Sequence, residues 1–316
     1  SNICTAQALL ATMAGFYAVY HGPEGIRTIA GRIHSIAAFL EKEINKLGYR
    51  QMNAQYFDTL RFALPDNVSA QQVRTVALSK EVNLRYFKNG DVGMSIDETT
   101  DLAAVNVLLS IFGIAAGKDY TKAADIPESC TIAEAFRRQS AYLTHEVFNK
   151  YHTETEMMRY IKRLDRKDIS LAHSMISLGS CTMKLNAAAE MLPLSRPEFM
   201  GMHPLVPEDQ AEGYRELIHN LSEELKVITG FAGVSLQPNS GAAGEYAGLR
   251  VIRAYQESIG QGHRNKVLIP ASAHGTNPAS AVQAGFTTVT CACDEQGNVD
   301  MADLRAKAEE NKADLA

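Results

Sequence analysis

The sequence has no surplus of positively charged residues, and this absence restricts its partners. It contains 31 lysines and arginines against 36 aspartates and glutamates, so its net charge is −5. Nucleic-acid binding favours a basic surface, because cationic side chains replace the counterions of the phosphate backbone. The composition therefore argues against a general nucleic-acid binder.

Long hydrophobic runs and cysteine frameworks are also lacking. No run approaches the roughly 18 apolar residues of a membrane-spanning helix, so we expect no membrane partner. The five cysteines, Cys4, Cys130, Cys181, Cys291 and Cys293, are too few and too scattered for a disulfide framework. Cys291 and Cys293 also have no second pair to complete a zinc site. We expect reduced thiols, no metal, and a cytoplasmic location, or the mitochondrial matrix in a eukaryote.

The composition is otherwise that of a globular protein. Apolar residues make up 46% of the 316 residues and charged residues 21%, which suggests a sizeable core and roughly two domains. Residues 1–20 form an amphipathic helical pattern with no strand before it, and residues 303–316 end within a predicted helix that should lead into another strand. Both ends therefore predict a fragment of a longer protein.

Residues 1–117 show the pattern of a small α+β domain. The order is two helices that meet near residues 21–23, a strand at 57–64, a helix, a hairpin at 84–96 and a last helix. Ser69 with Gln72 predicts a capping box before the middle helix, and Asp101 begins the last one. Residues 118–206 contain many helix breakers and a second capping box, Thr153 with Glu156. We interpret this stretch as a connecting arm.

Residues 207–316 alternate between helical and strand patterns. The predicted strands are 231–236, 267–270 and 287–293, and helices lie before, between and after them. Such alternation is typical of a mostly parallel sheet, in which ligands bind at the carboxyl ends of the strands. Two loops fall at such ends, residues 237–245 and 270–278.

The first loop, Q-P-N-S-G-A-A-G-E, has the pattern of a phosphate site. Ser240 is a good N-cap residue, and the small side chains of residues 241–244 leave the N–H groups of the first helical turn accessible. These groups and the positive end of the helix dipole attract an anion. The alternative interpretation is a capped helix without a ligand.

The second loop, residues 270–278, contains a histidine among small residues. His274 alone is explained as well by a side chain that caps its own turn. Beside a phosphate site on the same sheet edge, however, its imidazole is suited to lie against a ring that is held by its phosphate. This combination points to pyridoxal phosphate.

Several long motifs carry a resemblance to a known family. They are S-L-G-S-C-T-M-K-L-N (177–186), H-P (203–204), L-Q-P-N-S-G-A-A-G-E-Y-A-G-L (236–249) and I-P-A-S-A-H-G-T-N-P-A-S-A (269–281). The segments S-N-I-C-T-A-Q-A-L-L-A (1–11) and Y-H-T-E-T-E-M-M-R-Y (151–160) extend the match. The sequence resembles the glycine decarboxylase family, the P-protein of the glycine cleavage system.

The resemblance implies an α/β fold of the aspartate-aminotransferase type (fold type I of the pyridoxal-phosphate-dependent transferases). On this basis residues 1–117 are the small domain of a first half, 118–206 the connecting arm, and 207–316 the truncated start of the second half's cofactor-binding domain. The family's covalent lysine is expected beyond residue 316, since neither Lys184 nor Lys266 stands at its position. We therefore expect the fragment alone to be inactive.

The resemblance also implies the activity and partners of the intact protein. It would decarboxylate glycine on pyridoxal phosphate and pass the aminomethyl group to the lipoyl arm of the H-protein. The two halves would pair, whereas the fragment would associate weakly. Alternatives are a non-catalytic structural or phosphate-binding module, or another decarboxylase of the same cofactor fold. The motif at 177–186 argues against the latter.

The resemblance assigns roles to individual residues as well. Ser240, Gly241 and Ala242 would bind the cofactor's phosphate, and His274 would stack on its ring as a catalytic residue. Thr276 and Asn277 would lie near the ring or its hydroxyl. Lys184, Asn186 and His203 would line the entrance for substrate or lipoyl arm, or else fix the connecting arm to the sheet.

Overall fold

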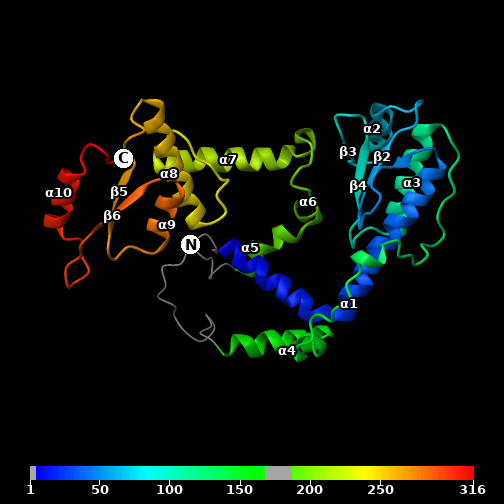
Figure 1. The fold of residues 1–316 in the computed structure, drawn as a ribbon, viewed down its shortest axis with the longest axis horizontal. Helices are drawn as coiled ribbons and strands as arrows, with labels where there is room; N and C mark the ends of the chain where they lie inside the picture. The colour runs from blue at the N-terminus through cyan, green and yellow to red at the C-terminus, as the bar shows by residue number, and fades with distance from the viewer. Residues whose placement is uncertain (1–4, 168–186) are drawn as a thin grey trace. The chain divides into compact units, whose positions relative to one another are not determined.

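The computed structural model describes residues 5–167 and 187–316 (Figure 1). The chain divides into two compact units, one of residues 15–168 and one of residues 1–14 with 169–316. Each unit has its own sheet, so the expected mixed α/β class is confirmed. The domain boundaries at 117 and 206 stay predictions.

Helix α1 (Thr5–Lys46) consists of two helical stretches that meet at a kink. Gly22 has φ 63° and ψ −178°, a combination that is almost restricted to glycine, and Pro23 follows it. Proline is favoured in the first turn of a helix, where its missing N–H group has no partner to lose. The predicted break near residues 21–23 is therefore confirmed.

The unit 15–168 is built on a four-stranded antiparallel sheet. Its strands are β1 (Arg50–Gln51), β2 (Thr59–Ala63), β3 (Arg85–Tyr86) and β4 (Val92–Ser95), in the order β1-β2-β4-β3. Helices α2 (Ala70–Ser79) and α3 (Leu102–Ala116) join α1 in one core with the sheet. The largest buried apolar side chains of this core are Ile36, Leu40, Ile44, Leu60, Phe62, Leu109, Ile111 and Phe112.

Side chains at the helix ends follow the sequence signals in two cases and depart from them in one. Ser69 and Gln72 form the complete capping box at α2, and Asp101 accepts a hydrogen bond from the N–H group of Ala104 in α3. Helix α4 (Glu154–Asp165) is capped by Thr153, whose hydroxyl accepts from the N–H group of Glu156. The Glu156 carboxylate accepts a hydrogen bond from the Thr153 hydroxyl, so this box lacks its reciprocal bond to the backbone.

Residues 118–153 contain two short 3-10 helices, Glu134–Phe136 and Glu146–Asn149. Within this stretch, residues 123–131 run from Asn106 on α3 to Ser35 and His34 on α1, and we call them the strap. The buried His34 accepts a hydrogen bond on Nε2 from the N–H group of Thr131 at 3.0 Å and donates from Nδ1 to the Phe57 carbonyl at 2.8 Å. His34 therefore links the strap to the loop before β2.

From residue 187 on, the second unit has short helices followed by alternating helices and strands. In chain order they are α5 (Ala188–Met191), the 3-10 helix Leu192–Ser195, α6 (Pro197–Met200), the 3-10 helix Glu208–Gln210, α7 (Glu212–Thr229), α8 (Gly241–Ser258), β5 (Lys266–Pro270), α9 (Thr276–Gln283), β6 (Thr287–Cys291) and α10 (Met301–Glu310). Strands β5 and β6 pair in parallel, as predicted, with Lys266 opposite Thr287 and Pro270 opposite Cys291.

The surroundings of β5 explain one correct and one wrong prediction. Leu315 forms a parallel bridge with Lys266, so the chain after α10 returns to the sheet as expected, but α10 ends at Glu310 and does not extend to residue 316 as predicted. Residues 231–236, predicted as a strand, are irregular. Their apolar pattern is typical of a buried strand, but the described residues supply no neighbouring strand, and Phe231 remains 69% exposed. A strand requires a hydrogen-bonding neighbour, which no local pattern guarantees.

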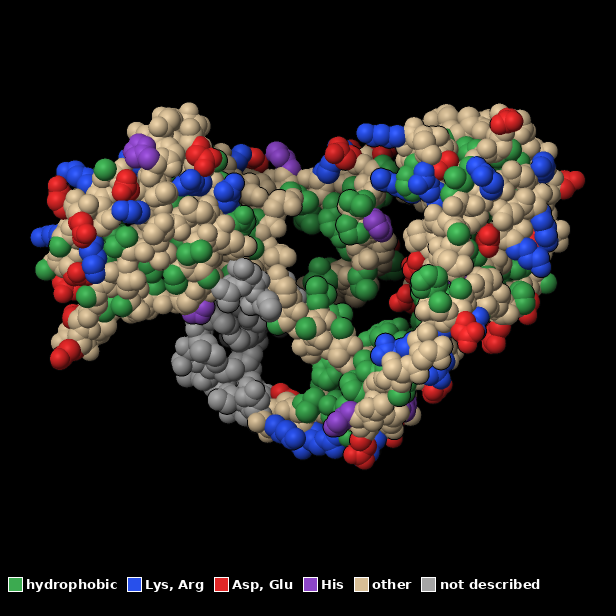
Figure 2. Space-filling model, viewed as in Figure 1, with side chains coloured by type: hydrophobic (Ala, Val, Ile, Leu, Met, Phe, Trp, Pro, Cys, Tyr) green, Lys and Arg blue, Asp and Glu red, His purple; other side chains and the backbone are tan. Residues whose placement is uncertain are grey.

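Apolar side chains also lie on the surface of both units. In the unit 15–168, Leu78 on α2 and Ile114 on α3 are exposed, and green side chains mark such surface in Figure 2. In the unit of residues 1–14 and 169–316, Leu9 on α1 and Ile218 and Val251 on α7 and α8 are exposed as well. No helix in residues 5–167 or 187–316 combines the length and apolarity needed to cross a membrane.

We expect Gly22→Ala to lower the free energy of unfolding by about 1–3 kcal/mol, because alanine is strained at this φ and ψ. Its Cβ would also lie 2.7 Å from the Phe148 carbonyl oxygen. Gly15→Ala, in the same helix with open space around it, should instead raise that free energy by about 0.5–1 kcal/mol. Urea denaturation followed by circular dichroism measures both. Equal effects would contradict a special role of the kink.

The β3–β4 turn carries a nearly buried carboxylate. Asp91 Oδ2 accepts from Asn89 Nδ2 at 3.0 Å and from Arg61 Nε at 2.7 Å. The hydrogen bond from Asn89, together with Arg61, lowers the pKa of Asp91 below its ordinary value of 3.8. This carboxylate therefore stabilises the fold above pH 3.8, and the contribution is lost as the pH falls through the lowered pKa.

Asp91→Asn should reduce the free energy of unfolding by about 1–3 kcal/mol at neutral pH, since it removes hydrogen bonds to a charged group. The difference from the wild type should shrink as the solution is acidified below pH 3.8. Urea denaturation across this pH range gives the measurement, with the exposed Asp66→Asn as the control. A difference that does not depend on pH would show that the charge of Asp91 is irrelevant.

Candidate functional site

The first turn of α8 has the features of an anion site. Ser240, in an extended conformation, caps the helix by accepting a hydrogen bond on Oγ from the N–H group of Ala243 at 3.2 Å. The N–H groups of Gly241 and Ala242 lie in the first turn, where a helix provides no acceptor. A Cβ placed on Gly244 would meet no atom within 4 Å. The helix start therefore combines available donors with open space.

The second loop follows β5 and holds His274 by its own turn. Nδ1 of the exposed His274 ring accepts a hydrogen bond from the backbone N–H group of Thr276 at 3.2 Å. The Thr276 hydroxyl lies 2.7 Å from the same nitrogen. Because a backbone N–H group can only donate, Nδ1 carries no proton, and a neutral ring carries its proton on Nε2. His274 thus caps its own turn, and its role in ring stacking stays a prediction.

Helices α8 and α9 bring parts of the two loops together (Figure 1). The Ser280 hydroxyl on α9 donates to the Glu245 carboxylate on α8 at 3.4 Å. A pocket of about 380 Å³ lies between these helices and β5, with Gly244, Glu245 and Asn277 in its lining. Of the predicted site residues that the structure describes, Asn277 is the one that lines this pocket. The other predicted residues of the two loops lie outside its lining.

The structure does not test the roles predicted for residues of the connecting arm. Lys184 and Asn186 lie outside the described residues. His203 is exposed, and its Nδ1 accepts a hydrogen bond from the N–H group of Leu205 at 3.0 Å, within a local turn. Its role at an entrance therefore stays a prediction.

Two residues near these loops were not predicted from the sequence as site residues. The Glu245 carboxylate lines the pocket and is suited to an ammonium or hydroxyl group of a ligand. Its position one turn after the Ser240 cap was the available signal. Cys293 donates from Sγ to the Ser272 hydroxyl at 3.2 Å, which links the loops after β6 and β5. Among residues 5–167 and 187–316, no group of three metal-ligating side chains occurs.

Helix α10 fixes the carboxyl end of β6 through an ion pair. Asp303 accepts from Lys307 Nζ at 2.8 Å and from the N–H group of Ala292 at 2.7 Å. The hydrogen bond from Lys307 is the main cause that lowers the pKa of Asp303, and the bond from Ala292 adds to it. The hydrogen bond to Asp303 in turn raises the pKa of Lys307. Lys307 also donates to the Thr290 carbonyl at 2.6 Å. The pair therefore positions the strand end rather than a ligand.

Comparisons with known proteins place this geometry in context. Residues 1–112 match the family model described as "Glycine cleavage system P-protein". Glycine dehydrogenase (decarboxylating) of Bacteroides fragilis strain YCH46 is 85% identical over 316 residues, which is all of this chain and 33% of that protein. The resemblance to the glycine decarboxylase family is confirmed.

More distant relatives of the same name cover the same share. The proteins of Shewanella amazonensis and Christiangramia forsetii are 56% identical over 320 residues and 52% identical over 316 residues. Each match covers all of this chain and 33% of the relative. The chain thus spans about a third of the length of these curated relatives.

The hydrogen bonds of two histidines predict opposite tautomers. Neutral His274 should carry its proton on Nε2, because Nδ1 accepts from the backbone of Thr276. Neutral His34 should carry it on Nδ1, which faces the Phe57 carbonyl, while Nε2 accepts from Thr131. Long-range ¹H–¹⁵N correlation spectra of the imidazoles, recorded at alkaline pH, distinguish the two forms. A proton on Nδ1 of His274 would contradict the described loop.

Proposed function

We propose that this chain is part of a pyridoxal-phosphate-dependent glycine dehydrogenase (decarboxylating). The observation that carries the proposal is the 85% identity to the Bacteroides fragilis enzyme along all 316 residues. The proposal includes a fold of the aspartate-aminotransferase type. The parallel β5–β6 pair, with two loops that follow the pattern of a cofactor site, supports that fold.

The start of α8 fits the phosphate group of this cofactor. The N–H groups of Gly241 and Ala242 and the Ser240 hydroxyl are donors of the kind that phosphate oxygens require. The 18-residue α8 adds the positive end of its dipole. Gly244 and Gly275 face open space, so a ligand meets no Cβ at these positions.

When bound, pyridoxal phosphate supplies an acceptor for the electron pair that remains as carbon dioxide leaves glycine. The residues of this chain contribute binding and orientation. Ser240, Gly241 and Ala242 bind the phosphate, while Thr276 fixes the His274 ring with its Nε2 proton directed away from the turn. Asn277, in the lining of the pocket, is available to bind a polar group of the ligand.

The proposal places the covalent lysine outside residues 1–316. Lys266 is at the amino end of β5, opposite to the loop 270–278, and its ammonium group pairs with Asp314 at 3.0 Å. It is therefore unsuited to reach a cofactor at the carboxyl end of the sheet. The intact protein would use glycine and a lipoylated H-protein as partners, in a cytoplasmic or mitochondrial-matrix setting. Lys184, Asn186 and His203 remain the candidates for their entrance.

Ser240→Asp separates phosphate binding from helix capping. Aspartate caps a helix as well as serine does, but its negative charge repels a phosphate group and removes the hydroxyl donor. We expect the affinity of this chain for pyridoxal phosphate, measured by equilibrium dialysis, to fall about tenfold or more. Ser69→Asp, at the cap of α2, is the matched control and should leave the affinity unchanged. An equal response of both variants would refute the phosphate site.

The activity itself is tested in a polypeptide of the relatives' full length. With pyridoxal phosphate and a lipoylated carrier protein, it should release labelled carbon dioxide from carboxyl-labelled glycine. Glutamate, as the alternative substrate, should release none. Release from glutamate but not from glycine would overturn the proposed function even if the phosphate site were correct.

A further inference from the structure

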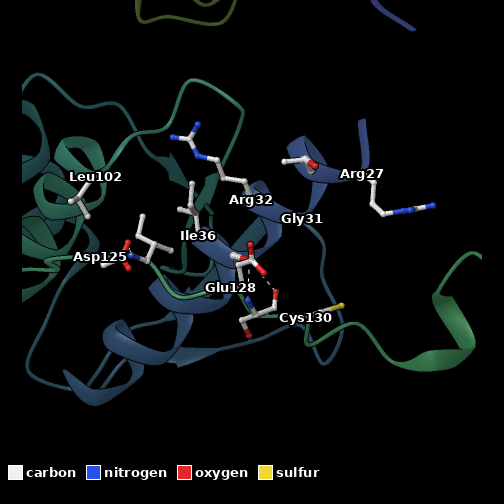
Figure 3. A pocket seen from close by; sticks show the side chains of 12 residues that line it. Arg27, Gly31, Arg32, Ile36, Leu102, Asp125, Glu128 and Cys130 are labelled. Carbon is white, nitrogen blue, oxygen red and sulfur yellow. Dashed lines mark hydrogen bonds between the residues drawn. The ribbon is translucent and has the colours of Figure 1, made fainter. Parts of the chain in front are cut away.

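A cavity of about 840 Å³ lies in the unit 15–168, between α1 and the strap (Figure 3). None of its lining residues belongs to the loops 237–245 or 270–278, so it is separate from the proposed cofactor site. Concave sites of this size are typical for small ligands. The chemistry of its walls indicates which class of ligand it fits.

The outer wall of the cavity is fixed at both ends by reciprocal hydrogen bonds. The Asn106 side chain donates to the Ala123 carbonyl at 3.1 Å and accepts from the Ala123 N–H group at 2.8 Å. The buried Ser35 hydroxyl donates to the Ser129 carbonyl at 3.1 Å and accepts from the Ser129 N–H group at 3.0 Å. Because both ends are anchored, residues 124–128 bridge the space between α1 and α3, and the cavity is formed without a ligand.

The floor is apolar, and the rim offers one cationic group. Ile36, which is 1% exposed, lines the floor with the half-buried Leu102 and Ile126. In Figure 3, Arg32 lies above Ile36, and it donates from Nη2 to the Thr100 carbonyl at 3.2 Å. Within the described part of the chain, this is the one hydrogen bond made by its five N–H donors. The guanidinium group is thus positioned by this hydrogen bond, and its other N–H groups are available to a ligand.

The remaining charges of the lining limit the charge of the ligand. Asp125 and Glu128 on the strap also line the cavity and would repel a second negative charge. Arg27 is part of the lining, but its guanidinium group pairs with Glu24 at 2.8 Å. Figure 3 shows the Arg27 side chain extended away from the side on which Arg32 and Leu102 lie. Of the two arginines in the lining, Arg32 is therefore the one on the side of Ile36 and Leu102.

We propose that this cavity binds a small amphipathic monocarboxylate. The planar carboxylate matches the fork of the Arg32 guanidinium group, which binds such groups in a bidentate manner. The apolar body of the ligand covers Ile36, Leu102 and Ile126. The cavity lies in a different unit from the two loops of the proposed pyridoxal phosphate site. This proposal therefore does not depend on the proposed function.

The exposed thiol of Cys130 provides a local test, because it lines the cavity. The rate of its alkylation by iodoacetamide is measured by peptide mass spectrometry on the whole chain, with hexanoate as the probe. Saturating hexanoate should slow the alkylation of Cys130 about fivefold or more, as full occupancy of a site excludes the reagent. The alkylation of Cys293, in the other unit, should not change. Absence of protection at Cys130 would overturn the proposal.

Two further probes test the charge of the ligand. Hexan-1-ol has the same apolar body without the charge, and adipate carries a second carboxylate that Asp125 and Glu128 would repel. Both should protect Cys130 at least about tenfold less effectively than hexanoate at equal concentration. Equal protection by hexan-1-ol would show that apolar contact alone is responsible. Equal protection by adipate would contradict the monocarboxylate specificity.

A matched pair of variants assigns the binding to Arg32. Arg32→Gln should weaken protection by hexanoate about tenfold or more, since it removes the charged fork from an exposed position. Arg27→Gln removes the same charge from the same helix, at a side chain that points away from Arg32 and Leu102. In this variant hexanoate should protect Cys130 as well as it does in the wild type. Equal protection of all three proteins would refute the role of Arg32. Thermal unfolding of the variants verifies that each is folded.

Discussion

The burial of one face of α1 is the interaction on which the unit 15–168 depends. Ile36, Leu40 and Ile44, at helical spacing, pack into the core with the sheet and α3 and are 1% exposed or less. Full burial of such a side chain contributes about 1.5–3 kcal/mol. The adjacent positions of the same helix then have fixed directions. Ser35 reaches the strap and Arg32 the cavity rim, because the core side chains determine the rotation of the helix.

In the second unit, the corresponding constraint is the parallel register of β5 and β6. With Pro270 opposite Cys291, both strands end at the same edge, and the loops that follow them are neighbours. The bond between Cys293 and Ser272 is a direct result of this register. A shift by one residue would turn the side chains of one strand to the opposite face and separate these groups. The contact between the loops after β5 and β6 thus depends on how the two strands pair.

The sequence predicted best those features that depend on neighbours along the chain. The kink at Gly22, the capping box of Ser69 and the hairpin turn before β4 each follow from a few adjacent residues. Residues 231–236 were predicted wrongly because a strand needs a distant partner. The candidate site was predictable up to the Ser240 cap and the two loops. The place of Glu245 in the pocket was not, since it depends on how α8 packs on α9.

The geometry of His274 separates what a local motif determines from what a ligand must determine. Among the described residues, Thr276 makes the hydrogen bonds to its Nδ1, so Nε2 is the nitrogen left for an external contact. A ring that is already oriented loses little conformational freedom when a partner binds to its face. The N–H groups at the start of α8 are likewise fixed by the helix itself. Because each loop is ordered by its own turn, the packing of α8 on α9 supplies the remaining condition for the two loops to lie near each other.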